Sequence, residues 1–428
     1  MKIKDIEMRN FRCFEELKVN LDDDYTVFIG INGSGKSTIL DAISLAMGSY
    51  LSGFDNISPE GIHIDDAHYK VYKMGSNVES QRQFPVDIIA TADINGSRVN
   101  WKRSLNGEKR KTTIADAKAI RDIGYSYQKM VREGDDSCIL PLVAYYGTGR
   151  LWMQKKSKKS KSKKIDINRT VGYVDSLDVA SNEKLMIKWF EKMTYIQLQT
   201  GETVPELEAV KSAMSKCYLS ADDSLTSVNF IYDVNSEEIE IVMKHNDERL
   251  EKLPMKSLSD GIKGVLSMVA DIAYRMAILN PQLLGDVLKT PGIVLIDEVD
   301  MHLHPEWQKK IISDLTSIFK EVQFVFTTHS PSIVANVPKE NIWILDEHKL
   351  YRPSNNTYGR DVGSILAEIM ASDVRPSEVK KLIENFYLAI DDSDIDKAGT
   401  ILGKMRDILG DHDSDVVKAQ VYLDFEGM

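Results

Sequence analysis

Apolar and polar residues alternate along the first thirty positions, which is the pattern of β-strands with one buried face. I-K-D-I-E-M at 3–8 and E-L-K-V-N-L at 16–21 both alternate, and Y-T-V-F-I-G at 25–30 is a compact apolar run ending in glycine. After a glycine-rich turn, S-T-I-L-D-A-I-S-L-A-M at 37–47 has apolar residues at helical spacing. The pattern therefore predicts three short strands followed by a helix.

Two more segments of the first half have strand patterns. Residues 84–105 predict two strands joined at Asn95-Gly96, a favoured two-residue hairpin turn. C-I-L-P-L-V-A-Y-Y-G at 138–147 is apolar enough for a buried strand, although Pro141 is unfavourable inside one.

The second half changes from helical patterns to strand–helix alternation. Two helices broken near Gly201 are predicted over 181–216, and a strand hairpin over 226–243. Strand and helix patterns alternate over 292–346, which predicts a parallel sheet covered by helices. From about residue 361 the pattern is helical, with D-D-S-D at 391–394 separating two amphipathic segments.

Composition narrows the class of protein. The 428 residues are 43% hydrophobic and 28% charged, a globular balance, and the formal charge of −11 argues against a chain that coats nucleic acid with its whole surface. Three cysteines, Cys13, Cys138 and Cys217, lie far apart, as is typical of reduced intracellular proteins. No apolar leader and no uncharged run approaching 18 residues is present, so we expect a soluble, cytoplasmic protein without a membrane segment.

The glycine-rich turn has the chemistry of a phosphate loop (Walker A). G-I-N-G-S-G-K-S at 30–37 fits G-x-x-x-x-G-K-[ST] and lies between a predicted strand and a predicted helix. Backbone N–H groups of such a loop surround phosphates, the lysine reaches the β/γ oxygens, and the hydroxyl after it binds Mg²⁺. The predicted residues for binding ATP are Gly30, Asn32, Gly33, Gly35, Lys36, Ser37 and Thr38, with Ser37 also a ligand of Mg²⁺.

A second candidate site follows the apolar strand I-V-L-I at 293–296. Asp297 suits a role in holding Mg²⁺, and Glu298 a role in orienting or deprotonating the attacking water. His302 and His304 follow at a spacing of two. Without further cysteine or histidine partners they favour turn or helix-start structure over a metal pair.

The next predicted strand ends in a single histidine, in F-V-F-T-T-H-S-P at 324–331. A lone histidine is commonly structural. Here, one strand after the acidic pair, His329 has the position expected of a γ-phosphate sensor and is a catalytic candidate with Glu298.

In this order, the elements resemble the ABC-type ATPase heads of the structural-maintenance-of-chromosomes (SMC), RecF and OLD group. N-F-R-C-F at 10–14, the phosphate loop and the segment 250–346 carry the resemblance. It implies an α/β ATPase head, with a mixed sheet, a P-loop helix and an antiparallel β lobe, interrupted by a helical insertion and followed by a small helical subdomain. It also implies nucleotide contacts by a signature serine and glycine, Ser259 and Gly261, and by Asp300 in a D-loop, and a switch role for His329.

The predicted domain organisation follows from that resemblance. One part of the head occupies 1–150, and a Lys/Ser-rich loop and helical insertion occupy 151–220. The other part of the head, with signature, acidic strand and histidine, occupies 221–355, and a helical tail that offers a partner or oligomer contact occupies 356–428.

The chain departs from the group at the signature and at the Q-loop. Asp260 stands where glycine is usual and Ile262 where glutamine is common. No Q-loop glutamine is evident, and Tyr146 and Arg150 are the candidates to replace it. These changes favour slow hydrolysis.

Within the group, the chain resembles the ATPases of the Septu antiphage system and of some retron defence loci, the PtuA family. A-Y-Y-G-T-G-R-L-W, L-S-D-G, D-E-V-D-M-H-L-H-P-E-W-Q and T-Y-G-R-D-V-G-S-I-L carry this closer resemblance. It implies a regulatory ATPase that controls a separately encoded HNH nuclease (PtuB-like). A second subunit of the same chain is expected to close over the γ-phosphate through Ser259, so that the protein is a homo-oligomer.

Other functions use some of the same motifs. A RecF- or SMC-like DNA-binding repair ATPase is the alternative, since an ATP-gated clamp would use the same motifs. An OLD-type nuclease needs a Toprim domain after His329, whereas the residues that follow predict one strand pair and helices. A transporter ATPase is expected to have L-S-G-G-Q, where this chain has L-S-D-G-I. The Lys/Ser run at 155–164 could bind nucleic acid or be a solvated loop, because it lacks aromatic residues to stack bases.

Overall fold

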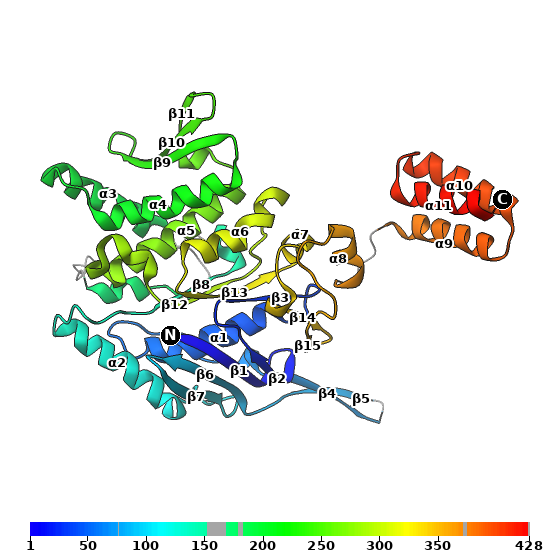
Figure 1. Cartoon of the computed structure of the whole chain (residues 1–428). Coiled ribbons are helices and arrows are strands. Elements are labelled where there is room, and N and C mark those ends of the chain that lie inside the picture. The colour runs from blue at the N-terminus through cyan, green and yellow to red at the C-terminus, as the bar shows by residue number, and fades with distance from the viewer. Residues whose placement is uncertain (76, 152–167, 179–182, 371–374, 427–428) are drawn as a thin grey trace. The chain divides into compact units, whose positions relative to one another are not determined.

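The computed structural model describes residues 1–75, 77–151, 168–178, 183–370 and 375–426 (Figure 1). The chain divides into two compact units, Met1–Arg360 and Asp361–Met428. In the part of the chain that is described, no helix is long and apolar enough to span a membrane.

A six-stranded sheet forms the centre of the first unit, in the order β15-β14-β3-β13-β12-β8. Its strands are β3 (Tyr25–Ile29), β8 (Leu142–Tyr146), β12 (Gly292–Ile296), β13 (Val322–Thr328), β14 (Ile342–Asp346) and β15 (Lys349–Tyr351). All pair in parallel except β15. The strands β8, β12 and β13 are buried along their whole length, because helices cover both faces of a parallel sheet.

A four-stranded antiparallel sheet, β2-β1-β6-β7, forms a β lobe. Its strands are β1 (Lys2–Phe11), β2 (Phe14–Asn20), β6 (Val86–Ile94) and β7 (Ser97–Leu105). The predicted hairpin is confirmed: Asn95 and Gly96 have φ of 49° and 77°, the left-handed values that a type I′ turn requires.

Helix α1 (Lys36–Leu51) contacts strands of both sheets. The indole N–H of Trp101 on β7 donates to the carbonyl of Ala46 at 3.0 Å, which fixes the helix to the β lobe. The buried amide of Gln323 on β13 exchanges two 2.8 Å hydrogen bonds with the backbone of Ile3, which joins the sheets directly. Helix α1, which follows the phosphate loop, is therefore held by contacts with both sheets.

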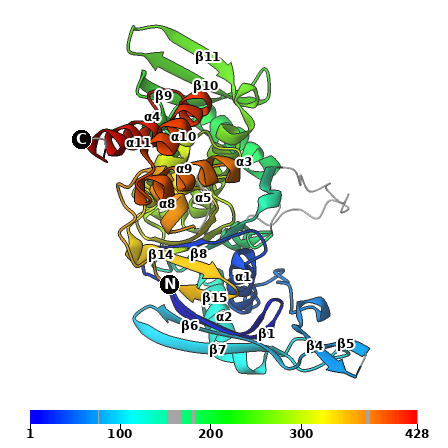
Figure 2. The ribbon, with the colours of Figure 1, turned by 90° about the vertical axis from the view of Figure 1, so that its right-hand side faces the viewer.

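Helices and a small sheet cover the face of the six-stranded sheet that lies opposite α1 (Figure 1). They are α3 (Glu183–Thr200), α4 (Pro205–Ala221), α5 (Asp260–Leu279), α6 (Pro305–Ile318), β9 (Leu225–Asp233), β10 (Glu238–His245) and β11 (Leu250–Pro254). Figure 2 shows the β9–β11 sheet and the β lobe at opposite ends of this unit. The predicted helix pair broken near Gly201, the hairpin after it and the strand–helix alternation are all confirmed.

The remaining elements of the first unit are short or peripheral. The hairpin β4 (Tyr69–Met74) and β5 (Asn77–Arg82) and the helix α2 (Lys118–Arg132) were not predicted from the sequence pattern. A single helical turn, α7 (Pro331–Val334), follows β13.

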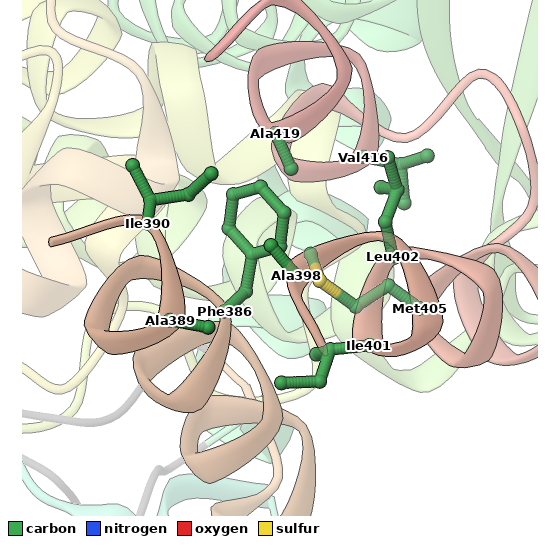
Figure 3. Close-up of a cluster of buried hydrophobic side chains, with 9 residues drawn as sticks. All are labelled: Phe386, Ala389, Ile390, Ala398, Ile401, Leu402, Met405, Val416 and Ala419. Carbon is green, nitrogen blue, oxygen red and sulfur yellow. The ribbon is translucent and has the colours of Figure 1, made fainter. Parts of the chain in front are cut away.

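The second unit is helical, as predicted, and begins at Asp361. It contains α8 (Val362–Glu368), α9 (Ser377–Asp391), α10 (Ile395–Leu409) and α11 (Ser414–Glu426). The last three helices share a core in which Phe386, Leu402 and Met405 are buried (Figure 3). The D-D-S-D segment forms the turn between α9 and α10, where Asp394 accepts from the backbone N–H of Lys397. The α/β fold class is thus confirmed, including its antiparallel lobe, helical insertion and helical subdomain.

Candidate functional site

The phosphate loop joins the buried end of β3 to the first turn of α1, and its glycines are required by its geometry. Gly30 has φ of 153°, and a Cβ on it would lie 2.3 Å from the carbonyl oxygen of Leu345. Gly33 and Gly35 have φ of 82° and 111°, and Gly35 is the N-cap residue of α1. Asn32 and Ser37 are exposed, whereas Thr38 is buried. The loop therefore presents backbone N–H groups and the Ser37 hydroxyl at a helix N-terminus, where an anion is stabilised.

Lys36 is folded back over the loop. Its side chain is buried, and Nζ donates to the carbonyl oxygens of Gly30 and Ile31, each at 3.0 Å. Burial lowers the pKa of Lys36, and the charges of Asp297 and Glu298 oppose that shift. The ammonium group is thus placed between the phosphate loop and the acidic strand end.

Strand register explains why these distant segments meet. Ile29 on β3 pairs with Thr328 on β13, so Gly30 and His329 leave neighbouring strands side by side. Ile296 on β12 pairs with Phe326 on the other edge of β13, so Asp297 follows directly beside Thr327. The carboxyl ends of parallel strands lie at one edge of a sheet, which is where α/β proteins bind ligands.

The acidic pair is held by Thr327. The Thr327 hydroxyl donates to Oδ1 of buried Asp297 at 2.5 Å and accepts from the backbone N–H of Glu298 at 2.7 Å. The φ of Glu298 is 45°, so the chain turns sharply after Asp297. Thr327 thus holds both the Asp297 carboxylate and the Glu298 backbone at the turn where β12 ends.

These oxygen donors fit a magnesium ion bound together with a nucleotide. Mg²⁺ takes one or two carboxylates, with substrate phosphates and water completing its octahedron. Asp297 and Ser37 supply a carboxylate and a hydroxyl at the phosphate-binding end of the sheet. In the described residues no group of three or more His, Cys, Asp or Glu side chains could hold a metal by itself.

His329 is half-buried at the end of β13. Burial lowers its pKa from 6.5, the charge of Lys36 lowers it further, and the acids Asp300, Glu298 and Asp297 oppose both effects. The imidazole is therefore kept neutral near pH 7, a state in which it donates one hydrogen bond.

Asp300 lies in the loop after β12 and is attached to the next strand. Its Oδ1 accepts a 2.6 Å hydrogen bond from the Thr328 hydroxyl, which also accepts from the backbone N–H of Ser330. Thr328, the residue before His329, thereby attaches Asp300 to the segment that carries His329.

The candidate signature residues begin α5. Ser259 is exposed and occupies the N-cap position, yet among the described residues its side chain makes no capping hydrogen bond. Gly261 is buried, and a Cβ on it would lie 2.1 Å from the carbonyl oxygen of His302. The start of α5 is therefore packed against the loop that carries Asp300.

His302 and His304 have separate structural positions. His304 is the N-cap residue of α6 and its Nδ1 accepts from the backbone N–H of Glu306 at 3.4 Å. His302 has φ of 61° in the turn before it. Turn and helix-start structure, favoured from the sequence, is what the structure has.

A network beside α1 was missed in the sequence. Arg12, in the loop between β1 and β2, donates to Asp41 on α1 and, at 2.8 Å, to Asp66. Tyr145 on β8 donates to the other oxygen of Asp41 at 2.8 Å. The motifs N-F-R-C-F and A-Y-Y-G contain two of these residues, but only the fold brings them together.

The neighbouring Tyr146 points to the opposite face of the sheet, as alternation along a strand requires. Its hydroxyl donates to Asp271 on α5 at 2.7 Å, and Arg275 donates to the same carboxylate at 2.7 Å. Tyr146 therefore joins the sheet to α5. The side chain of Arg150, the other Q-loop candidate, and the Lys/Ser run at 155–164 lie outside the described residues.

Comparison with known proteins shows which ATPases the chain resembles. The retron Vc95 probable ATPase of Vibrio cholerae and the retron Ec83 probable ATPase of Escherichia coli are each 26% identical to the chain over 90% of its length. The alignments cover 83% and 79% of those relatives. The Septu protein PtuA of Bacillus mycoides is 23% identical over 81% of the chain, which spans 41% of that relative. These relatives confirm the predicted resemblance to Septu and retron ATPases.

Family models locate the match along the chain. A model described as an AAA domain matches residues 5–253, which include the phosphate loop, and a second AAA-domain model matches 205–335, which include the acidic strand and His329. The first match covers more than half of the chain. The chain belongs to the AAA-domain family and is a nucleotide-binding ATPase.

Proposed function

We propose that the chain binds ATP with Mg²⁺ at the phosphate loop and hydrolyses it slowly as the regulatory subunit of an antiphage defence complex. The observation that carries the ATP site is the strand register, which gathers the phosphate loop, Asp297–Glu298 and His329 at the ends of three adjacent strands. Lys36 would bind the β/γ-phosphates, and Ser37 and Asp297 would hold the metal, which neutralises charge developing on the phosphates.

Hydrolysis in this proposal depends on Glu298 and His329. Glu298 would follow the metal-binding position by one residue, where its carboxylate suits a group that orients or deprotonates water. His329 is kept neutral and lies beside Gly30, where it would donate to the γ-phosphate.

Nucleotide-binding assays test the site. Lys36→Ala is expected to abolish binding of ATP, because it removes the buried cation of the loop, whereas Glu298→Gln is expected to keep binding and lose hydrolysis. Lys349→Ala, at an exposed lysine of β15, is the control. Equal ATP affinity in Lys36→Ala and the parent protein would overturn the assignment.

A second copy of the chain would complete the site. Ser259 is exposed at a helix N-terminus with its hydroxyl uncommitted among the described residues, and Gly261 holds that end against the Asp300 loop. In this proposal the γ-phosphate bound by one subunit contacts Ser259 and Asp300 of the other, so nucleotide state is coupled to assembly.

The helical second unit is the proposed contact for a separately encoded HNH nuclease. Val417, Val421 and Phe425 recur every fourth residue along α11 and are 49%, 48% and 75% exposed. Residues at this spacing share one helix face, and the opposite face, with Val416 and Ala419, fills the unit's own core (Figure 3). An apolar stripe left exposed beside a complete core suits a partner protein.

Co-expression with the HNH protein encoded beside this chain tests that contact. Val421→Glu is expected to abolish co-purification, whereas Lys404→Glu, at an exposed lysine of α10, is expected to leave it unchanged. Both variants should keep ATP binding, since α10 and α11 belong to the other unit. Co-purification that survives a charge at both 417 and 421 would exclude this surface.

A further inference from the structure

A cavity of about 560 Å³ lies beside the C-terminal half of α1, away from the phosphate loop. Gly48 and Ser49 line it, more than three helical turns beyond Lys36, or roughly 18 Å along the axis. The segment Pro59–Ile64, the end of β7 and the loop at 108–114 form its other walls.

The floor of this cavity contains a buried cation. Arg103 on β7 is 5% exposed, and its Nη1 donates to the carbonyl oxygens of Leu45 at 2.6 Å and Glu60 at 2.9 Å. Among the described residues no carboxylate forms an ion pair with it. Burial alone lowers the pKa of Arg103 to about 10. A guanidinium is normally paired with an anion when it is taken out of water, because desolvating an unpaired charge is costly.

Two buried donors at this floor have no partner in the structure. Among the residues that the structure describes, Nε of Arg103 makes no hydrogen bond, and neither does the hydroxyl of Ser49, a residue that is 1% exposed. Buried polar groups are nearly always hydrogen-bonded, so two such groups in one cavity indicate a missing acceptor. Glycines at 48 and 61 leave space at the guanidinium: a Cβ on Gly48 would lie 3.2 Å from Nη1.

The rim of the cavity is also mainly basic. Arg110 and Lys111 line it, are exposed, and form no ion pair within the part of the chain that is described. The lining therefore contains three cationic side chains, Arg103, Arg110 and Lys111, and one carboxylate, that of Glu108. This charge selects an anion, and a guanidinium with a neighbouring hydroxyl suits phosphate oxygens.

We propose that this cavity binds a small phosphorylated ligand, with Arg103 and Ser49 donating to its phosphate from the floor and Arg110 and Lys111 from the rim. The volume exceeds that of an inorganic anion and falls within the range of small-molecule sites. The site is separate from the phosphate loop and does not depend on the function proposed for that loop.

The position of the cavity gives the ligand a route to the ATPase. Pro59, Gly61 and His63 line this cavity and also a smaller one of about 230 Å³, which contains Arg12 and Asp41. The backbone N–H of His63 donates to Asp66, and Asp66 accepts from Arg12. A phosphate bound by Arg103 would thus contact the segment Pro59–Ile64. That segment also lines the smaller cavity, which contains Arg12 and Asp41 of the network beside α1.

Calorimetric titration with inorganic pyrophosphate tests the proposal in full-length Lys36→Ala, in which the phosphate loop is disabled. We expect one pyrophosphate per chain to bind. Arg110→Glu with Lys111→Glu should weaken that binding about tenfold or more, since two charge-assisted contacts are lost. Lys109→Glu, which reverses one charge of the same loop at a residue outside the lining, should change that binding by less than about threefold.

Ser49→Ala gives a readout that does not depend on the rim. Because the Ser49 hydroxyl has no partner within the described part of the chain, its removal should not lower the unfolding midpoint but should weaken pyrophosphate binding several-fold. The proposal is overturned if Lys36→Ala binds no pyrophosphate, or if Lys109→Glu weakens binding as much as the double variant. Loss of binding to Lys36→Ala with intact ATP binding by the parent would reject this cavity and leave the phosphate loop assignment standing.

Discussion

The α-carbon of Gly261 faces the carbonyl oxygen of His302 so closely that a Cβ would come within 2.1 Å of it. Gly261 belongs to the first turn of α5, and His302 to the loop that also carries Asp300. The candidate signature and the candidate D-loop are therefore one packed surface. A side chain at 261 cannot be accommodated by a rotamer change, because the obstacle is backbone.

Gly261→Ala should accordingly destabilise the protein. Separating α5 from the His302 loop costs about 1–3 kcal/mol, the usual range for an overpacked site. Urea unfolding measures this change, with Gly285→Ala as the control, because a Cβ at 285 meets no atom within 4 Å. Equal midpoints for the two variants would show that the contact is relaxed in solution.

The exposed residues before Gly261 should control assembly rather than stability. Ser259→Arg is expected to prevent ATP-dependent association by placing a bulky side chain where the second subunit's phosphate would lie. Asp260→Gly is expected to tighten association, because it removes a negative charge from the vicinity of a triphosphate. Light scattering of the Glu298→Gln protein with and without ATP measures both. If neither substitution changes association, Ser259 is only the start of a helix.

Local periodicity predicted most of the elements, because each pattern is contained in a short stretch. The phosphate loop is the clearest example, since eight consecutive residues carry its glycines, lysine and hydroxyl. The hairpin β4–β5 escaped prediction because both of its faces are largely exposed, so its apolar residues mark no buried side. Helix α2 could have been found: Ile120, Gly124 and Tyr127 have helical spacing and form its buried face.

The contacts within the site required the fold. Arg12, Asp41, Asp66 and Tyr145 lie in four separate segments, and nothing in one segment specifies the others. Sequence also placed Tyr145 and Tyr146 in one motif without showing that they face opposite sides of the sheet. Alternation along β8 makes the first a neighbour of α1 and the second a neighbour of α5.

The buried group of Tyr146, Asp271 and Arg275 should hold α5 on the sheet. Asp271→Ala leaves the guanidinium of Arg275 buried without its carboxylate, which costs about 3–5 kcal/mol. Tyr146→Phe removes one hydrogen bond to that carboxylate and should cost about 1–3 kcal/mol. Urea unfolding tests the order of these effects. Glu306→Ala, which breaks an exposed pair with Lys309, should leave the midpoint unchanged.

His329 should make the free energy of unfolding fall at acid pH, because its surroundings lower its pKa in the folded chain. Burial and the charge of Lys36 lower its pKa below 6.5 in the folded chain, so the unfolded chain takes up the proton first as pH falls. This residue therefore leaves stability unchanged well above pH 6.5 and reduces it as the pH falls through 6.5 towards the folded pKa. His329→Gln removes that loss. The free energy of unfolding of this variant relative to the parent should therefore rise as the pH falls from about 7.5 to about 5.5.

Bound ATP should counteract the lowering of the His329 pKa that the charge of Lys36 causes. A γ-phosphate beside His329 favours the imidazolium, so ATP should raise the pKa of His329, and the parent and His329→Gln proteins should then respond more alike to acid. Unfolding of the Glu298→Gln background, with and without ATP, separates this contribution because hydrolysis is removed. A pH response of His329 that is identical with and without ATP would place the γ-phosphate away from this side chain and remove His329 from the proposed sensor role.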